Sequence, residues 1–192
     1  MKQDTKQKII EAGAQIIHHK GYNHTGIQEI LAAAGVPKGS FYFYFKNKED
    51  FGLQVISYFE TVFASMIAPV MDDTTRSPID KIEGILDFFI DMFQEMNFEN
   101  GCPIGNLAQE MGDLNPAFSH KLTGAVERMA LIYRNLLDEA TETGLIKAKL
   151  PTDEMAEFIV SSWHGALIKM KINRDSGPLA LHKKMILAMI TV

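Results

Sequence analysis

The chain has 192 residues, a formal net charge of −5 and a single cysteine, Cys102. This length is enough for one large or two small domains with a hydrophobic core, and a single cysteine excludes an internal disulfide. No window reaches the ~18 uninterrupted apolar residues that a membrane-spanning helix needs, and the polar N-terminus lacks the apolar core of a signal peptide. These features predict a cytoplasmic protein that does not enter the membrane.

The first predicted helix covers residues 5–20 and ends at Gly21. Two short helices are then predicted within residues 25–48, because Gly35 can adopt the left-handed conformation that ends a helix and Pro37 suits the first turn of the next. Thr25 is expected to cap the first of them, with Gln28 three residues later as in a capping box. This pair predicts a helix-turn-helix, which places its second helix in the major groove of DNA. The alternative is a helical hairpin with a surface aromatic cluster.

The second short helix has two expected faces. Phe41 and Phe45 lie on one face and are expected to anchor the helix to the core. The remaining side chains are left to meet DNA, and Lys48 is expected to contact a phosphate. The predicted DNA-binding residues are Thr25, Lys38, Gly39, Ser40, Tyr42, Tyr44 and Lys48.

Charge is distributed unevenly along the chain. Residues 1–48 contain seven lysines and three acidic residues, a net charge of +4. Because the whole chain has a net charge of −5, residues 49–192 must carry −9. The acidic remainder should repel phosphate and leave one end of the molecule to bind DNA. A charge run is also common on an ordinary solvated face, so this asymmetry only supports the assignment.

Residues 5–55 resemble the N-terminal DNA-binding domain of TetR/AcrR-type repressors. The resemblance rests on a helix-cap threonine, a glycine turn, a Lys-Gly helix start, an aromatic run that closes on Phe, and a Lys-Glu pair. These are Thr25, Ala34-Gly35-Val36, Lys38-Gly39-Ser40, Phe41 to Phe45, and Lys48-Glu49. The resemblance implies a helix-turn-helix domain at residues 1–47 and an effector-binding and dimerisation domain at residues 48–192. Pro37 stands where the family usually has Ser or Thr, and Tyr44 where His is frequent, so operator choice could differ.

The rest of the chain has helical periodicity throughout, which predicts an all-α fold. An N-terminal three-helix helix-turn-helix domain would be followed by a C-terminal helical bundle. The further helices are predicted at residues 48–70, 79–97, 103–111, 116–143, 152–173 and 179–190.

Two of these helices predict a homodimer. In the helix 152–173, small residues four apart (Ser161 and Gly165, Ser162 and Ala166) would let another helix approach closely. The helix 116–143 has a broad apolar face formed by Leu122, Met129, Ile132, Leu136 and Leu137. The pair could form half of an intermolecular four-helix bundle, and a dimer would read a palindromic operator in double-stranded DNA. The alternative is that both faces are buried within one subunit.

Aromatic and thioether side chains crowd the helices 48–70 and 79–97. Such a stripe is often core, but it could also line an apolar cavity for a small-molecule effector. The predicted effector-binding residues are Phe63, Met66, Phe89, Met92, Phe93, Cys102, Asn106 and Trp163. No cofactor or metal is predicted, because the chain has no Gly-rich phosphate loop and no zinc-ligand spacing.

Cys102 is a candidate sensor. Residues 101–110 and 163–174 resemble a TetR subgroup that includes repressors of electrophile-detoxifying reductases and of acrylate metabolism. This resemblance implies redox sensing by Cys102, with Lys171 near it. A helix beginning at Pro103 would favour the thiolate, whereas acidic sequence neighbours oppose it. The alternative is a structural or ligand-lining cysteine.

The sequence therefore predicts a dimeric DNA-binding transcriptional regulator, a repressor that a small-molecule effector or electrophile releases from its operator. An enzyme is not predicted. The alternative is a helical enzyme acting on a small carbonyl compound, which would need Glu110 and His164 to converge in one pocket. A purely structural helical protein is a third interpretation.

Overall fold

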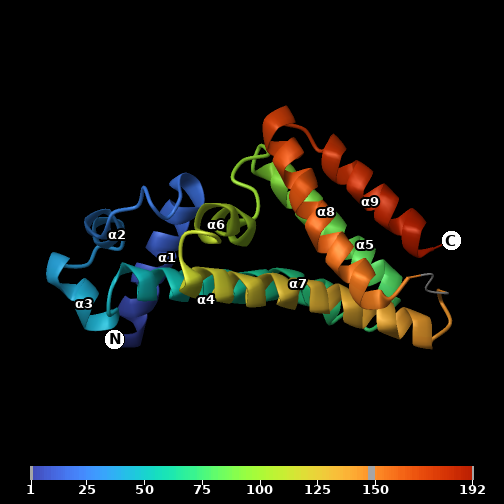
Figure 1. The fold of residues 1–192 in the computed structure, drawn as a ribbon, viewed down its shortest axis with the longest axis horizontal. Coiled ribbons are helices and arrows are strands. Elements are labelled where there is room, and N and C mark those ends of the chain that lie inside the picture. The colour runs from blue at the N-terminus through green and yellow to red at the C-terminus, as the bar shows by residue number, and fades with distance from the viewer. Residues whose placement is uncertain (1, 147–149, 192) are drawn as a thin grey trace. The chain divides into compact units, whose positions relative to one another are not determined.

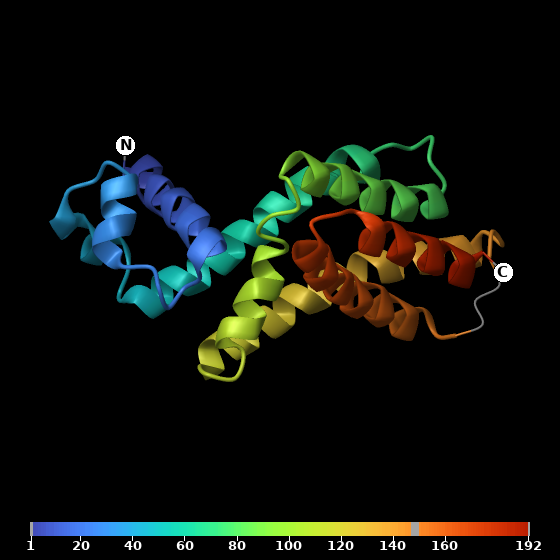
Figure 2. The same cartoon turned by 90° about the horizontal axis from the view of Figure 1, so that it is seen from above.

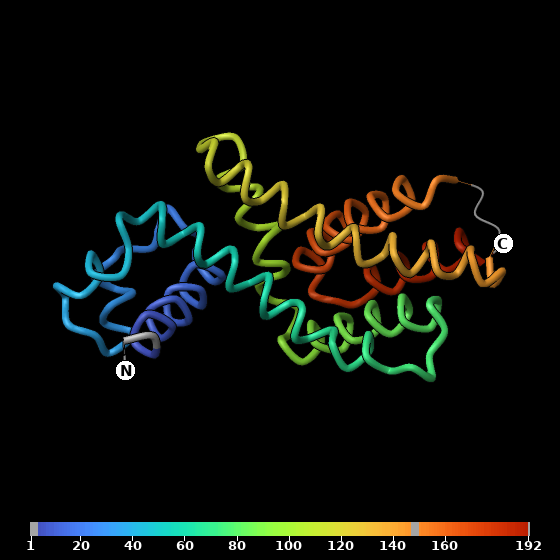
Figure 3. Tube along the Cα trace, turned by 90° about the horizontal axis from the view of Figure 1, so that it is seen from below, coloured from blue at the N-terminus to red at the C-terminus, as the bar shows by residue number. Residues whose placement is uncertain are grey.

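The computed structural model describes residues 2–146 and 150–191, and within these ranges the chain forms helices and no strand. The predicted all-α fold is therefore confirmed. The first elements are α1 (Lys2–Lys20), α2 (Ile27–Ala33), a 3-10 turn η1 (Lys38–Ser40) and α3 (Phe41–Tyr44). They are followed by α4 (Lys48–Met71), α5 (Pro78–Glu95), α6 (Pro103–Met111), α7 (Pro116–Glu142), α8 (Thr152–Asn173) and α9 (Gly177–Ile190). Figure 3 shows α4 and α7 as continuous helices.

Glycines end helices where the sequence predicts it. Gly21, Gly35 and Gly144 have φ values of +89°, +64° and +72°, a conformation that costs glycine little because it has no Cβ. The link after α5 contains further left-handed residues, among them Asn97 and Phe98 with φ of 52° and 60°. This left-handed pair explains why α5 ends at Glu95, two residues before the predicted end.

The expected cap at Thr25 is wrong. Gly26 is the N-cap of α2 and no side chain caps it. The Thr25 hydroxyl instead donates to the Gly21 carbonyl at 2.7 Å, and Thr25 is only 1% exposed. Pro37 also precedes a 3-10 turn rather than an α-helical first turn, so the second short helix begins at Phe41.

The chain folds into two compact units. Unit 1 comprises Met1–Phe63 and Pro103–Ala125, and unit 2 comprises Ala64–Cys102 and Val126–Val192. This division differs from a boundary at residue 47, because the start of α4, all of α6 and the start of α7 belong with the helix-turn-helix. The sequence-based boundary followed the order of motifs, which cannot reveal that a later helix packs back on the first domain.

Unit 1 has an aromatic core beneath the short helices, which lie close together near the N-terminus (Figure 1). The rings of Phe41 and Phe45 lie 5.0 Å apart, and Phe51 of α4 lies 5.6 and 5.0 Å from them. By length and composition α4 could cross a membrane. Within the fold, 22% of its apolar window is buried, and Phe51, Val55 and Ile56 are among the buried residues of α4.

Unit 2 is organised around α9, which packs on α5 and α8 (Figure 2). Lys183 of α9 bridges Glu83 and Asp87 of α5 at 2.8 and 2.6 Å, and this carboxylate pair raises the pKa of the ammonium although burial lowers it. On the other side, the His182 Nε2 lies 3.2 Å from the Ile159 carbonyl of α8.

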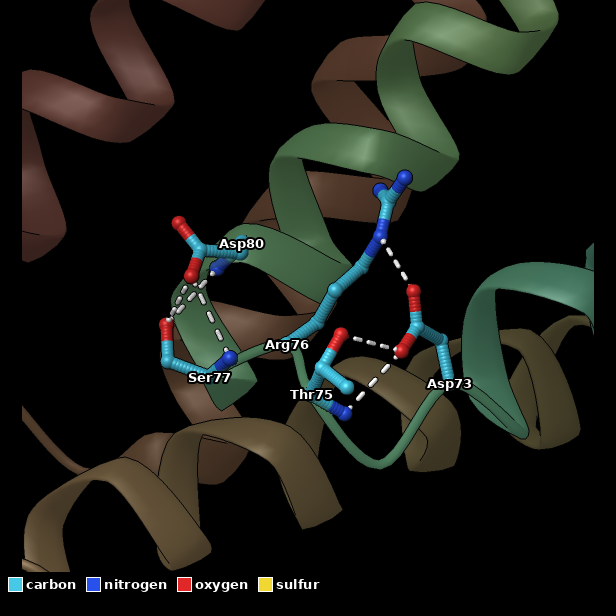
Figure 4. Close-up of polar contacts among 5 residues, drawn as sticks. All are labelled: Asp73, Thr75, Arg76, Ser77 and Asp80. Carbon is cyan, nitrogen blue, oxygen red and sulfur yellow. Dashed lines mark hydrogen bonds and ion pairs between the residues drawn. The ribbon is translucent and has the colours of Figure 1, made fainter.

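The loop between α4 and α5 is ordered by its own side chains (Figure 4). Asp73 accepts from the Thr75 hydroxyl and pairs with Arg76. Ser77 then caps α5: its hydroxyl accepts from the Asp80 N–H, while the Asp80 carboxylate accepts from the Ser77 N–H. This reciprocal capping box satisfies two N–H groups at the helix start.

Candidate nucleic-acid interface and effector region

Two aromatic residues of α3 are exposed while their neighbours anchor the helix. Phe41 and Phe45 are buried in unit 1, whereas Tyr42 and Phe43 are 70% and 65% exposed. Apolar rings that remain exposed at this level on an anchored helix are typical of a surface that receives a partner.

The exposed face of α3 borders a groove of about 790 Å³ within unit 1. Its lining includes the two predicted lysines, Lys38 and Lys48, together with Tyr42. The other lining residues come from the loop after α1 and from α2: Asn23, His24, Thr25, Gly26, Ile27, Gln28 and Leu31. A groove with two lysines and an aromatic hydroxyl suits an anionic polymer that offers both phosphates and flat bases.

Lys48 is held in a defined position in this groove. Its Nζ donates to the Tyr22 carbonyl at 2.7 Å and lies 4.3 Å from the centre of the Tyr22 ring. Burial lowers the pKa of Lys48, and the Glu110 carboxylate partly opposes that shift. The ammonium is therefore pre-positioned at the groove by contacts within the protein.

The other predicted DNA-binding residues differ in exposure. Lys38 and Gly39 are exposed, whereas Ser40 and Tyr44 are half-buried. Thr25 is buried, and its hydroxyl holds the loop by donating to the Gly21 carbonyl, so the predicted contact of this side chain with DNA is not supported.

Sequence reasoning missed the exposed Phe43 and six residues of the groove lining. These six are Asn23, His24, Gly26, Ile27, Gln28 and Leu31. The exposure of Phe43 could have been predicted from helical spacing. Phe41 and Phe45 are four residues apart and share the buried face, whereas Phe43 lies two residues from each of them and so points away from that face. Asn23 and His24 lie in a loop, where no periodicity reports on exposure.

The predicted effector residues are divided between the two units. Phe63 and Asn106 belong to unit 1. The other predicted residues belong to unit 2: Met66, Phe89, Met92, Phe93, Cys102 and Trp163. Phe89 and Phe93 are buried, and the rest of the predicted set is half-buried. Cys102 is half-buried just before α6, and Lys171 is exposed on α8.

Two histidines of unit 2 have buried ring nitrogens that lack a hydrogen-bond partner. His164 places Nδ1 3.0 Å from the Val160 carbonyl, which leaves its Nε2 unpartnered. His182 uses Nε2 toward α8, and its Nδ1 is unpartnered. Its ring lies 5.2 Å from that of Trp163. Burial lowers the pKa of both imidazoles, and the facing carbonyls only partly oppose it.

The residues required by the enzyme alternative have other contacts. Both oxygens of Glu110 accept backbone N–H groups of unit 1, and His164 belongs to unit 2. Among the described residues there is also no group of three or more His, Cys, Asp or Glu side chains able to hold a metal ion.

An exposed stripe runs along α8, at positions three and four apart. It consists of Phe158, Ser161, Gly165, Ile168 and Ile172, and Ile172 is 76% exposed. On α9, Leu181 and Met185 are exposed as well. Of the face predicted on α7, Leu122, Leu136 and Leu137 are buried within the chain, whereas Met129 and Ile132 are half-buried.

Comparison with known proteins gives consistent results over most of the chain. A model described as "Bacterial regulatory proteins, tetR family" matches residues 9–55, and one described as "Tetracyclin repressor-like, C-terminal domain" matches residues 78–186. The transcriptional regulator AcuR of Cereibacter sphaeroides is 36% identical over 173 residues, 90% of this chain and 79% of AcuR. The HTH-type transcriptional repressor DhaR of Mycobacterium sp. (strain GP1) is 33% identical over 174 residues, 91% of this chain and 86% of DhaR.

The fold is also found in a solved structure. The crystal structure of a regulatory protein TetR from Rhodobacter sphaeroides has a TM-score of 0.87 and 34% sequence identity to this chain. The match covers 96% of this chain and 97% of that one. The helix-turn-helix and the helical C-terminal part therefore have counterparts in a single regulatory protein.

Proposed function

We propose that this chain, which belongs to the TetR family of bacterial transcriptional regulators, represses transcription by binding a palindromic operator as a homodimer and is released by a small molecule. It is a DNA-binding regulator, and its relatives AcuR and DhaR are a transcriptional regulator and a transcriptional repressor. The observation that carries the proposal is the groove of unit 1, which Lys38, Lys48 and Tyr42 line and next to which Phe43 is exposed.

The proposed binding mode assigns different roles to the two kinds of side chain. Tyr42 and Phe43 project from α3 and would contact bases in the major groove, while Lys38 and Lys48 would contact phosphates. Ser40, Gly39 and Tyr44 remain proposed contacts of the same segment. A dimer would place two such units on half-sites whose centres lie roughly 34–36 Å apart, or a multiple of that distance.

The proposed dimer interface is the exposed stripe of α8 together with Leu181 and Met185 of α9. Support comes from the chemistry of the stripe, where two small residues, Ser161 and Gly165, lie between large apolar ones. Small residues at the centre let two helices approach closely, and the flanking apolar side chains then become buried.

The proposed effector region of unit 2 combines apolar and polar groups. Phe89 and Phe93 offer buried apolar surface, and the unpartnered Nδ1 of His182 lies in the ring that contacts Trp163. Unsatisfied buried nitrogens are uncommon and are stabilised by a hydrogen-bond donor. A small effector with an apolar body and one donor group fits this combination. Cys102 and Lys171 remain the proposed sensor pair for an electrophile.

The proposed DNA interface is tested by alanine substitutions in the full-length protein. Lys48→Ala should weaken binding to all DNA sequences alike and reduce the salt slope of the binding constant by roughly one unit, as expected for one lost phosphate contact. Tyr42→Ala should lower affinity for a duplex selected by the wild-type protein from a random pool. Fluorescence anisotropy at several salt concentrations measures both effects.

Lys81→Ala is the matched control, because Lys81 lies on α5 in unit 2. It should leave both the affinity and the salt slope unchanged. Binding by the wild-type protein that does not depend on salt would contradict the proposed interface.

A further inference from the structure

A carboxylate of α6 is bonded to the loop that follows α1. The Glu110 Oε2 accepts the Tyr22 N–H at 2.8 Å, and Oε1 accepts the Asn23 N–H at 2.7 Å. A Cβ at Gly21, just before this pair, would lie 2.9 Å from the Glu110 Oε2, so a side chain there would displace the carboxylate. One side chain therefore satisfies two consecutive N–H groups, with charge-assisted bonds that are stronger than neutral ones.

The same stretch of backbone holds Lys48 from its other side. The carbonyl of Tyr22 accepts from the Lys48 Nζ, and the Tyr22 ring lies under the ammonium. This ring is fixed in turn by Phe118, 4.8 Å away, and by Gly52, where a Cβ would lie 2.7 Å from it. Burial, with the nearby carboxylates of Glu49 and Glu110, raises the pKa of Tyr22 to about 12.

The loop held in this way forms one wall of the groove. Asn23, His24 and Thr25 line it together with Lys48, whereas Glu110 is outside the lining. Glu110 therefore contacts the wall of the groove through the backbone of Tyr22 and Asn23, and its charge also acts on Lys48, whose pKa it raises against the effect of burial.

We propose that Glu110 is a positioning residue for operator binding. By holding the N–H groups of Tyr22 and Asn23, it sets the position of the Tyr22 carbonyl, which directs the Lys48 ammonium into the groove. The inference rests on the proposed function, because it assumes that this groove receives DNA. The proposal predicts an effect on DNA affinity opposite to that of charge. The negative charge of Glu110 would by itself repel a phosphate near Lys48, so the proposed gain in affinity comes from the position that Glu110 gives to Lys48.

The test uses the full-length protein and fluorescein-labelled duplexes, one selected from a random pool and one of random sequence. Glu110→Ala should weaken binding to both duplexes roughly 10-fold and reduce the salt slope by roughly one unit, because Lys48 loses its fixed position. Glu110→Gln keeps one oxygen acceptor and should show a smaller loss. If Glu110 acted through its charge, both variants would bind DNA more tightly, and that result overturns the proposal.

A double-mutant cycle separates positioning of Lys48 from general stability. Glu110→Ala in a Lys48→Ala background should cause little further loss, because the two residues act through one contact. Additive losses would overturn the proposal. If Glu110→Ala unfolds below the assay temperature, Glu110→Gln is tested by the same criteria.

Glu60→Gln is the control for loss of a carboxylate in unit 1, where Glu60 pairs with Lys121 at 3.0 Å. It should bind both duplexes like the wild type. Different results would contradict the role of Glu110 and the proposed DNA interface. Wild-type binding by Glu110→Ala alongside weak binding by Lys48→Ala contradicts only the role of Glu110. Wild-type binding by both Lys48→Ala and Tyr42→Ala contradicts the DNA interface itself.

Discussion

Single residues of this chain serve the fold and the binding surface at once. Lys48 is bonded to a backbone carbonyl in the DNA-free protein, so its position at the groove does not depend on a phosphate. An ordered lysine loses less side-chain entropy on binding than a mobile one, for which the cost reaches roughly 2 kcal/mol. Thr25, in contrast, serves the fold, because its hydroxyl donates a hydrogen bond to the Gly21 carbonyl.

Cys102 carries the prediction about the effector. Cys102 is half-buried and directly precedes the first residue of α6, so an adduct adds bulk at the start of this helix, and packed helices respond by rearrangement rather than by continuous deformation. Treatment with N-ethylmaleimide should therefore release the protein from DNA. Cys102→Ser should bind DNA normally and ignore the reagent.

Gel shifts with and without the reagent check this outcome. Cys102 is the only cysteine, so the serine variant removes every thiol from the chain. If that variant still responds like the wild type, Cys102 is a structural residue and the effector binds without a covalent bond.

At the scale of elements, the sequence predicts helices well and their local capping less well. Helix-ending glycines such as Gly35 could be recognised because only glycine adopts a left-handed conformation at little cost. The Thr25 cap could not be assigned reliably, because a hydroxyl can bond either to the following N–H groups or to a preceding carbonyl. The groove was likewise only half predicted: Lys38, Tyr42 and Lys48 followed from the motif, whereas Asn23 and His24 depend on how a loop folds.

The start of α5 offers an element-scale prediction. Ser77 and Asp80 form the reciprocal capping box, so Ser77→Ala should lower the free energy of unfolding by about 1 kcal/mol. Denaturant titration measures the change. Thr74→Ala is the control, because Thr74 is exposed in the same loop outside the box, and an equal loss in both variants would contradict the capping role.

At the scale of the molecule, the division into units follows spatial contacts rather than chain order. The helix α6 is separated from the helix-turn-helix by more than 50 residues, yet Glu110 and Met111 contact the loop after α1. Long-range contacts of this kind leave no periodic trace in a sequence. Three residues of the predicted α7 dimer face, Leu122, Leu136 and Leu137, are buried within the chain, and an apolar face in a sequence does not reveal whether its partner lies in the same chain.

The dimer provides the prediction at this scale. A Cβ at Gly165 would meet no atom within 4 Å inside the chain, and leucine favours a helix more than glycine does. Gly165→Leu should therefore preserve the monomer fold but push two α8 helices apart, which shifts the protein toward monomer and lowers operator affinity. Analytical ultracentrifugation measures the shift.

Gly165→Ala is the matched control, because a methyl group still allows a close approach of the helices. It should remain dimeric. A wild-type protein that sediments as a monomer at micromolar concentration would contradict the interface.

The exposed rings of Tyr42 and Phe43 have a consequence for the released protein. In the proposed binding mode, DNA covers these rings, so the operator stabilises the folded protein in the way any ligand of the native state does. A molecule displaced by its effector regains this uncovered aromatic surface. Release therefore leaves a protein in which two aromatic rings of α3 are open to collisions with other chains, so the released protein is more prone to self-association than the DNA-bound one.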